Sequence, residues 1–329
     1  MSSRLSLAAD SGLFVVPTDG RLAVFSPTID TDLSILDKTR TDLIIQHYPD
    51  AHAFASAGWN VVQTPATDDY AMSLICVPRA KQFARALIAQ ATAITKGDVV
   101  VDGTKTDGAD SLFKAARKII ALGQAFSKAH GKTFVIPQSS NFSTWAEAEP
   151  AIDNGHGFIT RPGVFSSDKI DAGSAALLSC LPKTLGKHVI DLGAGWGYLS
   201  RDVLNRPEVE TLDLVEADAR ALNCARQNVT DPRARFHWDD ATTFQTKALA
   251  DTVITNPPFH TGRKGTPDLG RAFIKAAARL LKPKGQLFIV ANRHLPYEDT
   301  LQEVFKSGDE LHGTSGFKVF HARNPRRLG

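Results

Sequence analysis

Short apolar runs alternate with amphipathic segments through the second half of this 329-residue chain. The runs are typical of buried strands, and apolar residues at intervals of three or four positions are typical of helices. The predicted strands are KHVIDLGAG (187–195), which runs into glycines, TLDLVEAD (211–218), ARFHWDD (234–240), ADTVITN (250–256) and GQLFIVAN (285–292), with a helix expected over 269–285. This alternation predicts a parallel, doubly wound α/β sheet. A last run, GFKVFHAR (316–323), predicts a strand at an antiparallel edge.

The first half reads as a faded copy of the second. KGDVVVDGTK (96–105) aligns with KGQLFIVANR (284–293), and a similar helical segment precedes each of them. Likewise, RLAVFSPTID (21–30) takes the place of HVIDLGAGWG, and DLIIQHY (42–48) takes that of LDLVEAD. Self-similarity on this scale predicts tandem duplication, with a chance likeness of two doubly wound domains as the alternative. In this alignment Cys76 lies opposite Asn256, and Gln46 lies opposite Glu216.

These patterns divide the chain into a first domain at 1–140, a linker at 141–162 and a second domain at 163–329. Residues 138–157 are rich in Ser, Asn, Gly and acidic side chains, as connections between domains often are. The first copy has no glycine in its counterpart of the segment GAGWG. We therefore expect the chemistry in the second domain.

Composition excludes some classes of protein. The net charge of +3 and the pI near 8.7 permit a nucleic-acid partner without requiring one. The three cysteines are widely spaced without a CxxC pair, which predicts neither a disulfide framework nor a metal site. The chain has no signal-type start and no apolar stretch long enough to span a bilayer, so we expect a cytoplasmic protein without membrane association. A monomer is favoured over an oligomer.

A glycine loop follows the first strand of the second domain. Gly193 and Gly195 let the backbone approach a ligand closely, and the helix that follows adds amide donors. Glu216 ends the next strand, at about the spacing where dinucleotide folds place a carboxylate for ribose hydroxyls. The loop departs from the GxGxxG pattern, and Asp191 before it would repel phosphate but could pair with a cationic amine. Together these residues predict a cofactor without pyrophosphate.

The ordered set DLGAGWG (191–197), Glu216, DDA (239–241) and NPPF (256–259) is similar to that of class I S-adenosylmethionine-dependent methyltransferases. The run GVFSSDKIDAGSAALLSCLP (163–182) ahead of it resembles the ribosomal RNA small subunit methyltransferase C family. That family methylates the exocyclic N2 amine of a guanine in ribosomal RNA and carries a degenerate methyltransferase-like N-terminal half. The resemblance implies tandem Rossmann-like class I methyltransferase domains with a degenerate N-terminal copy. It also implies S-adenosylmethionine as cofactor and ribosomal RNA or a ribosomal subunit as partner.

The resemblance also implies a role for particular residues. The methionine part of the cofactor would lie against Asp191, Gly193, Ala194 and Gly195, its ribose at Glu216, and its adenine at Asp240 and Ala241. The target base would be held by Asn256, Pro257, Pro258 and Phe259, with Asn256 also beside the cofactor. Phe165, Ser166 and Asp171 would lie next to the pocket, either in a role there or as a structural cap.

The NPP corner suits the chemistry of a ring amine. The lone pair of a guanine amine is delocalised, so acceptors for both its N–H groups are needed to turn the lone pair toward a methyl group. We expect these acceptors to be the side-chain oxygen of Asn256 and the carbonyl of Pro257, fixed by the two prolines. Phe259 would stack on the base. His260, Arg263 and Lys264 could contact RNA or be solvated, whereas Tyr198 and Trp238 are expected in core packing.

Other functions stay open at this point. The same clamp could serve a different ribosomal guanine, including one in the large subunit, an adenine N6 amine or a protein glutamine amide. A non-catalytic RNA-binding assembly factor is a second class of function. The N-terminal copy would dock RNA or brace its partner domain.

Overall fold

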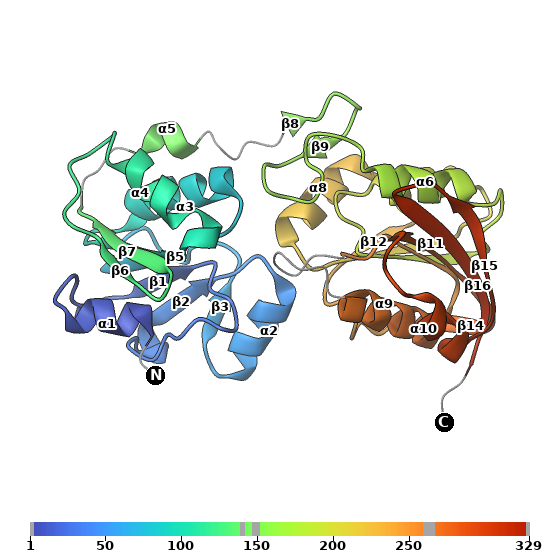
Figure 1. Ribbon diagram of the computed structural model, residues 1–329, viewed down its shortest axis with the longest axis horizontal. Helices are drawn as coiled ribbons and strands as arrows, with labels where there is room; N and C mark the ends of the chain where they lie inside the picture. Colours follow the sequence, from blue (N-terminus) through green and yellow to red (C-terminus); the bar gives the residue numbers. More distant parts are fainter. Residues whose placement is uncertain (1–2, 139–141, 147–151, 259–266, 327–329) are drawn as a thin grey trace. The chain divides into compact units, whose positions relative to one another are not determined.

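A computed structural model describes residues 3–138, 142–146, 152–258 and 267–326. The chain divides into two units, Met1–Pro150 and Ala151–Gly329, and each unit contains a seven-stranded sheet (Figure 1). This division falls within residues 141–162, where the sequence predicts a linker. Within that range, the short helix α5 (Ser143–Ala146) packs on the first unit, and the hairpin of β8 (Ile152–Asp153) and β9 (Ile159–Thr160) belongs to the second.

The sheet of the second unit is doubly wound, as predicted. Its strands, in spatial order, are β12 (Ala234–Trp238), β11 (Thr211–Glu216), β10 (His188–Leu192), β13 (Ala250–Thr255), β14 (Leu281–Asn292), β16 (Phe317–Pro325) and β15 (Phe305–Gly313). The strands from β12 to β14 run parallel, and β16 is antiparallel to both of its neighbours. The carboxyl ends of the parallel strands therefore meet at one edge of the sheet.

Two predictions for this unit were wrong in detail. The late strand β16 is not an edge strand, because β15 lies outside it. The sequence FKSGDELHG of β15 lacks the apolar alternation by which strands are recognised. The helix expected up to 285 is α9 (Pro267–Leu280), and β14 begins directly after it. Pro283 cannot continue a helix, which accounts for the earlier end.

Helices cover both faces of this sheet. They are α6 (Ala172–Cys180), α7 (Tyr198–Val203), α8 (Ala219–Asn228), α9 and α10 (Glu298–Val304). Alternate residues of β10 point to opposite sides, so Ile190 packs with Phe273 of α9 whereas Val189 packs with Leu177 of α6. This alternation is what a parallel sheet buried on both faces requires. The sheet is thus held by apolar packing that leaves its carboxyl edge to the loops.

The first unit repeats the arrangement. Its strands, in spatial order, are β3 (Asn60–Val62), β2 (Thr41–Ile44), β1 (Leu22–Phe25), β4 (Met72–Cys76), β5 (Val99–Thr104), β7 (Gly131–Ile136) and β6 (Phe126–Lys128). Its helices include α1 (Arg4–Asp10), α2 (Tyr48–Ser56), α3 (Lys81–Ile94) and α4 (Ala109–Ala116). Numbered along the chain within each seven-stranded sheet, the strands follow one order, 3-2-1-4-5-7-6, in both units. The prediction of tandem Rossmann-like domains is confirmed.

Strand pairing fixes which residues of the two units correspond. With Cys76 at the end of β4 opposite Asn256, the registers place Ile45 opposite Glu216. The sequence alignment, which placed Gln46 there, is therefore wrong by one position. Ile45 is buried and apolar, so the first unit has no carboxylate at this position.

Across the described ranges, no helix combines the length and the apolar character needed to cross a bilayer. The cysteines are free thiols, with Cys224 buried and Cys76 and Cys180 half-buried.

Candidate active site

The glycine loop leaves β10 at its carboxyl end and turns into α7. Gly193 has a φ of 74° and donates its amide to the carbonyl of Val215 at 2.9 Å. Gly195 has a φ of 58° and donates its amide to Oε2 of Glu216 at 2.8 Å. A Cβ built on Gly195 would meet no atom within 4 Å, so this backbone faces open space. The loop thus presents bare peptide to a ligand, as predicted from its glycines.

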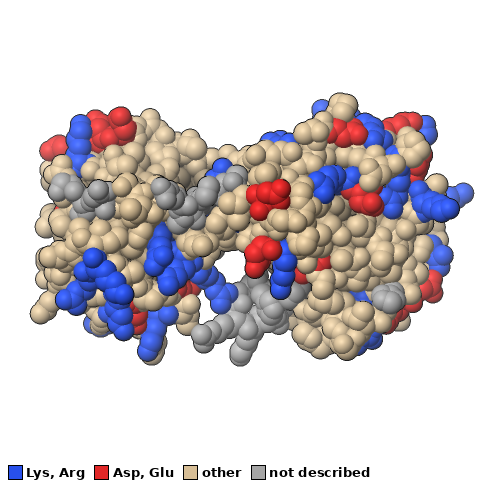
Figure 2. Space-filling model, turned by 90° about the horizontal axis from the view of Figure 1, so that it is seen from above, with Lys and Arg blue, Asp and Glu red and all other residues tan. Residues whose placement is uncertain are grey.

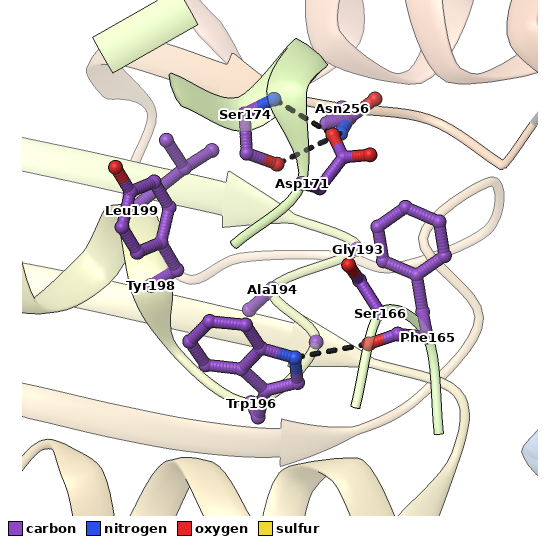
Figure 3. A pocket seen from close by; sticks show the side chains of 11 residues that line it. Phe165, Ser166, Asp171, Ser174, Gly193, Ala194, Trp196, Tyr198, Leu199 and Asn256 are labelled. Carbon is purple, nitrogen blue, oxygen red and sulfur yellow. Dashed lines mark hydrogen bonds between the residues drawn. The ribbon is translucent and has the colours of Figure 1, made fainter. Parts of the chain in front are cut away.

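A small pocket opens beside this loop (Figure 3). Its lining comprises Phe165, Ser166, Asp171, Ser174, Gly193, Ala194, Gly195, Trp196, Tyr198, Leu199 and Asn256. The structure therefore brings the glycine loop, the end of β13 and the start of α6 to one place. Phe165, Ser166 and Asp171 lie next to the pocket, as the resemblance implies. Asp191, Glu216, Asp240 and Ala241 are not part of its lining.

Asn256 is held in one orientation from across the pocket. Its Nδ2 donates to Oδ2 of Asp171 at 2.9 Å and to Oγ of Ser174 at 2.8 Å (Figure 3). The same Asp171 oxygen caps α6 by accepting the amide of Ser174 at 2.8 Å. A carboxylate can only accept, so it must face the amide nitrogen rather than the amide oxygen. The side-chain oxygen of Asn256 is consequently left on the other side, available as an acceptor.

The proline corner follows directly. β13 ends at Thr255, one residue before Asn256, as the two prolines predict. Pro257 is buried and Pro258 is exposed. Phe259, predicted to stack on the base, lies outside the described residues, as do His260, Arg263 and Lys264.

Asp191 lies under the glycine loop. Its side chain is fully buried, and Oδ2 accepts a hydrogen bond from Oγ of Ser200 at 2.7 Å. Burial raises the pKa of this carboxyl to about 7, with a smaller contribution in the same direction from Glu216, although the Ser200 bond opposes the rise. Its Oδ1 is buried without any hydrogen-bond partner among the described residues. An unpaired buried acceptor is costly unless a donor arrives with a ligand, so this atom suits a cationic amine.

Glu216 ends β11, and Asp240 follows the end of the neighbouring strand β12 by two residues. Glu216 accepts the amides of Gly195 and Asp218 with its two oxygens, each at 2.8 Å. Burial raises the pKa of Glu216 above its ordinary value despite these bonds. Asp240 uses Oδ1 to accept from the amide and hydroxyl of Thr242, while its other oxygen has no partner among the described residues. Ala241 is buried in the core beside it.

Sequence reasoning missed four residues of the site: Ser174, Trp196, Asn228 and Leu199, which lines the pocket. Ser174 binds Asn256, as described above. Trp196 lines the pocket and donates its indole N–H to the carbonyl of Phe165 at 2.9 Å. Asn228 donates Nδ2 to the carbonyls of Trp196 and Ile159, at 2.7 and 2.8 Å, and so ties the glycine loop to the β8–β9 hairpin. The aromatic inside GAGWG was the available signal for Trp196, but no local pattern marks Asn228.

Tyr198 and Trp238 behave differently from each other. Tyr198 packs against Phe158 and Trp196, with ring centroids 5.7 and 5.8 Å apart, yet it also lines the pocket. The expectation of core packing alone was therefore incomplete for Tyr198. Trp238 is half-buried and donates its indole N–H to the carbonyl of Ala217 at 2.9 Å, away from the pocket lining.

Comparison with known families agrees with this geometry. The family described as Methyltransferase small domain matches residues 155–321, which include β9, the glycine loop and Asn256. A doubly wound sheet, a glycine loop and an Asn-Pro-Pro corner at its carboxyl edge, together with this match, define a methyltransferase.

Relatives narrow the class. The ribosomal RNA small subunit methyltransferase C of Shewanella sp. (strain MR-4) is 31% identical over 254 residues, covering 74% of this chain and 74% of that protein. The protein of the same name from Hahella chejuensis is 26% identical over 327 residues, covering 92% and 94%. The chain belongs to the ribosomal RNA small subunit methyltransferase C family.

A solved structure shares the whole fold. The 16S rRNA N2 methyltransferase (RsmC) of T. thermophilus, in complex with AdoMet and guanosine, superposes with a TM-score of 0.78 at 23% identity. The match covers 94% of this chain and 90% of that one, so it extends over both units.

Proposed function

We propose that this chain transfers a methyl group from S-adenosylmethionine to the exocyclic N2 amine of a guanine in small-subunit ribosomal RNA. The proposal rests on the orientation of Asn256, whose amide nitrogen is bound by Asp171 and Ser174 and whose oxygen is left to accept. An amine with two N–H groups needs such acceptors. The names of the relatives, and the guanosine bound in the T. thermophilus enzyme, agree with this substrate.

The cofactor is assigned to the glycine loop. Gly193 and Gly195 would lie against its methionine part, and the unpaired Oδ1 of Asp191 would face its ammonium group. Glu216 would bind the ribose, and Asp240, with Ala241 beside it, would hold the adenine. When bound, S-adenosylmethionine supplies a methyl group on a sulfonium sulfur, which leaves as a neutral thioether.

The residues of the chain act by positioning. The side-chain oxygen of Asn256 and the carbonyl of Pro257 would each accept one N–H bond from the guanine amine, which turns the nitrogen lone pair toward the methyl carbon. These oxygens are fixed before the substrate arrives, so their alignment costs nothing during the reaction. Neither oxygen is a useful base, and the methylated nitrogen releases its extra proton to water.

Product analysis tests the proposal directly. The full chain would be incubated with S-adenosylmethionine carrying a tritiated methyl group and with small subunits, large subunits, protein-free ribosomal RNA or bulk protein. Digestion to nucleosides should yield N2-methylguanosine from small-subunit RNA. Label in N6-methyladenosine, in large-subunit RNA alone or in protein would replace this substrate with another, and no transfer to any of them would leave an RNA-binding role.

The orienting residue has its own test. In Asp171→Ala, Asn256 loses one of two acceptors, so its amide is free to turn, and we expect the kcat at saturating RNA and cofactor to fall by about 10- to 100-fold. This change also removes a helix cap, at about 1 kcal/mol. Ser3→Ala is the matched control, since Ser3 caps α1 in the first unit by accepting the amide of Ser6. Equal losses of kcat in the two variants would show that Asp171 acts through stability alone.

A further inference from the structure

A second pocket lies at the carboxyl edge of the first unit's sheet. Its lining includes Arg79, Lys81, Thr106, Gly108 and Ser111, and we call it the α3–α4 pocket because the first turns of these helices form its walls. Arg79 follows β4, the strand equivalent to β13. The pocket is therefore built on the same loop that carries the Asn-Pro-Pro corner in the second unit.

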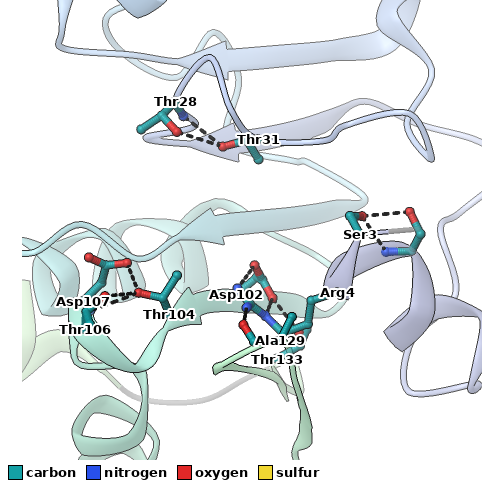
Figure 4. Close-up of polar contacts among 11 residues, drawn as sticks. Ser3, Arg4, Thr28, Thr31, Asp102, Thr104, Thr106, Asp107, Ala129 and Thr133 are labelled. Carbon is teal, nitrogen blue, oxygen red and sulfur yellow. Dashed lines mark hydrogen bonds and ion pairs between the residues drawn. The ribbon is translucent and has the colours of Figure 1, made fainter. Parts of the chain in front are cut away.

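Two cations in this pocket are unpaired. Arg79 and Lys81 are exposed, and no hydrogen bond or ion pair joins either of them to another described residue. Some other cations of the unit do have carboxylate partners, as in Lys132–Asp110 at 2.9 Å. Asp107 also lines the pocket, but its carboxylate accepts a hydrogen bond from the hydroxyl of Thr104 (Figure 4). The pocket thus carries two positive charges and one negative charge.

Helix electrostatics add to the positive side. The amino end of a helix carries partial positive charge, so acidic residues and side-chain caps are favoured there. α3 instead begins with Lys81, has Ala80 at its cap position without a side-chain hydrogen bond, and has no acidic residue in its first turn. α4 begins after Gly108, which has no side chain to cap the helix, and has Asp110 in its first turn. The rule is therefore broken at the start of α3, which faces the pocket, and such a departure is typical of a functional site.

We propose that the α3–α4 pocket binds a backbone phosphate of the RNA substrate. This inference rests on the proposed function and gives the first unit a part in it. A phosphodiester offers one negative charge and several acceptor oxygens, which suit a guanidinium and an ammonium placed at the amino ends of two helices. Such a contact positions RNA without reading its sequence.

The surroundings favour a long polyanion. Figure 2 shows Lys and Arg side chains gathered on one part of the surface of this unit, with few acidic side chains among them. Lys105, next to Thr106 of the pocket lining, is a further exposed cation. Cofactor binding does not fit this unit, because Ile45 stands where Glu216 stands in the other.

The test measures how salt weakens RNA binding by the full chain. In Arg79→Gln/Lys81→Gln, we expect weaker binding to small-subunit ribosomal RNA and to unrelated RNA alike. The slope of log affinity against log salt should become shallower by about 1 to 2, since each phosphate contact contributes roughly 0.7 to 0.9.

A matched variant separates the pocket from net charge. Lys96→Gln/Lys118→Gln removes the same charge just beyond the other ends of the same two helices, α3 and α4. We expect its slope to stay close to that of the unchanged protein. Equal slopes for the two variants, whether shallower or unaltered, would overturn the proposal.

Kinetics keep this inference distinct from the proposed function. In Arg79→Gln/Lys81→Gln, the KM for RNA should rise while kcat and the affinity for S-adenosylmethionine stay unchanged. A fall in kcat with KM unchanged would contradict a docking role. If the unchanged protein transfers no methyl group to RNA, the proposed function fails, and the salt slopes still decide whether the pocket binds phosphate.

Discussion

The two units have one fold but different carboxyl edges. On the cofactor side, Gly193 of the second unit and Ser26 of the first both take positive φ and donate to the adjacent strand, at 2.9 and 3.0 Å. The backbone turn is therefore kept. What differs is chemistry, because Glu216 offers a carboxylate where the first unit buries Ile45 in its core. Both units therefore share the turn, whereas only the second has the carboxylate that we assign to the cofactor site.

On the substrate side, too, the two units have equivalent elements that carry different side chains. α1 contacts β7 as α6 contacts the equivalent strand β16, so Ser3 corresponds to Asp171 as a helix cap. In the first unit Ser3 and Ser6 bond each other at 2.9 Å (Figure 4). Cys76 stands at the position of Asn256, and burial raises the pKa of this thiol to about 12. A neutral thiol offers no strong acceptor to an amine.

A structural ion pair strengthens the first unit at the same edge. Arg4 at the start of α1 binds both oxygens of Asp102 at 2.8 Å, and Thr133 donates to the same carboxylate (Figure 4). Arg4 and Asp102 are both largely buried. A bidentate pair of this kind fixes α1 to the sheet. The comparison teaches that a doubly wound sheet keeps its order when its polar edge is replaced, because apolar strand faces hold it together.

The largest expected effect comes from replacing Asn256, the residue directly after β13. Asn256→Ala removes the acceptor that we propose for the reacting amine, and we expect kcat to fall by about 10²- to 10³-fold, as when one fixed partner of a transition state is lost. The affinity for S-adenosylmethionine, measured by calorimetry, should change far less. Cys76→Ala at the equivalent position should leave kcat unaltered. Normal turnover of Asn256→Ala would remove this residue from the mechanism.

An intermediate effect is expected in the glycine loop. Gly195→Ala places a methyl group in the space that we assign to the cofactor, and overpacking of this kind costs about 1–3 kcal/mol, or roughly 5- to 150-fold in affinity. Gly58→Ala in the first unit is the control, since Gly58 also has a positive φ and an open Cβ position. Both variants bear similar backbone strain, so only the first should weaken cofactor binding. Titration of the unchanged chain with S-adenosylmethionine should give one bound cofactor per chain. Two bound cofactors would contradict the conclusion that the first unit, with Ile45 in the place of Glu216, binds none.

The smallest effect concerns pH. Burial raises the pKa of Asp213, but hydrogen bonds from His188 and His237, at 2.6 and 2.7 Å, outweigh it and hold the pKa below its ordinary value. The pKa of Asp42, the equivalent residue in the first unit, is lowered less. Burial raises it, and hydrogen bonds from Arg21, Tyr70 and Asn60 outweigh that rise. A lowered carboxyl pKa stabilises the fold above about pH 4, and this stability is lost as the pH falls.

Hydrogen exchange of the two sheets measures that difference. Protection of β10–β12 in the unchanged chain should decline on acidification from about pH 5, at up to about 1.4 kcal/mol for each unit of pKa shift. Asp213→Asn should flatten this decline, and Asp42→Asn should flatten that of β1–β3 by less. A steeper decline of protection in either variant would contradict the expected direction of the pH effect.

Much of this protein follows from local sequence. Apolar runs and their spacing predicted the doubly wound sheets, the paired prolines predicted the end of β13 at Thr255, and the glycines predicted the loop beside the pocket. Each depends on neighbouring residues alone. The failures included the end of α9, the polar strand β15 and a shift of one residue in the alignment at Ile45, and no strong sequence pattern marks the last two.

The sequence by itself determined the doubly wound class of the sheets, the glycine turn after β10 and the Asn-Pro-Pro corner after β13. Short-range sterics and apolar periodicity act within a few residues of one another, so a local stretch of sequence is enough to specify each of these features. Only the tertiary structure decided which way Asn256 faces, since its partners Asp171 and Ser174 lie 85 and 82 residues away along the chain. It also decided the burial that raises the pKa of Asp191. Hydrogen bonding and desolvation depend on what the fold brings together.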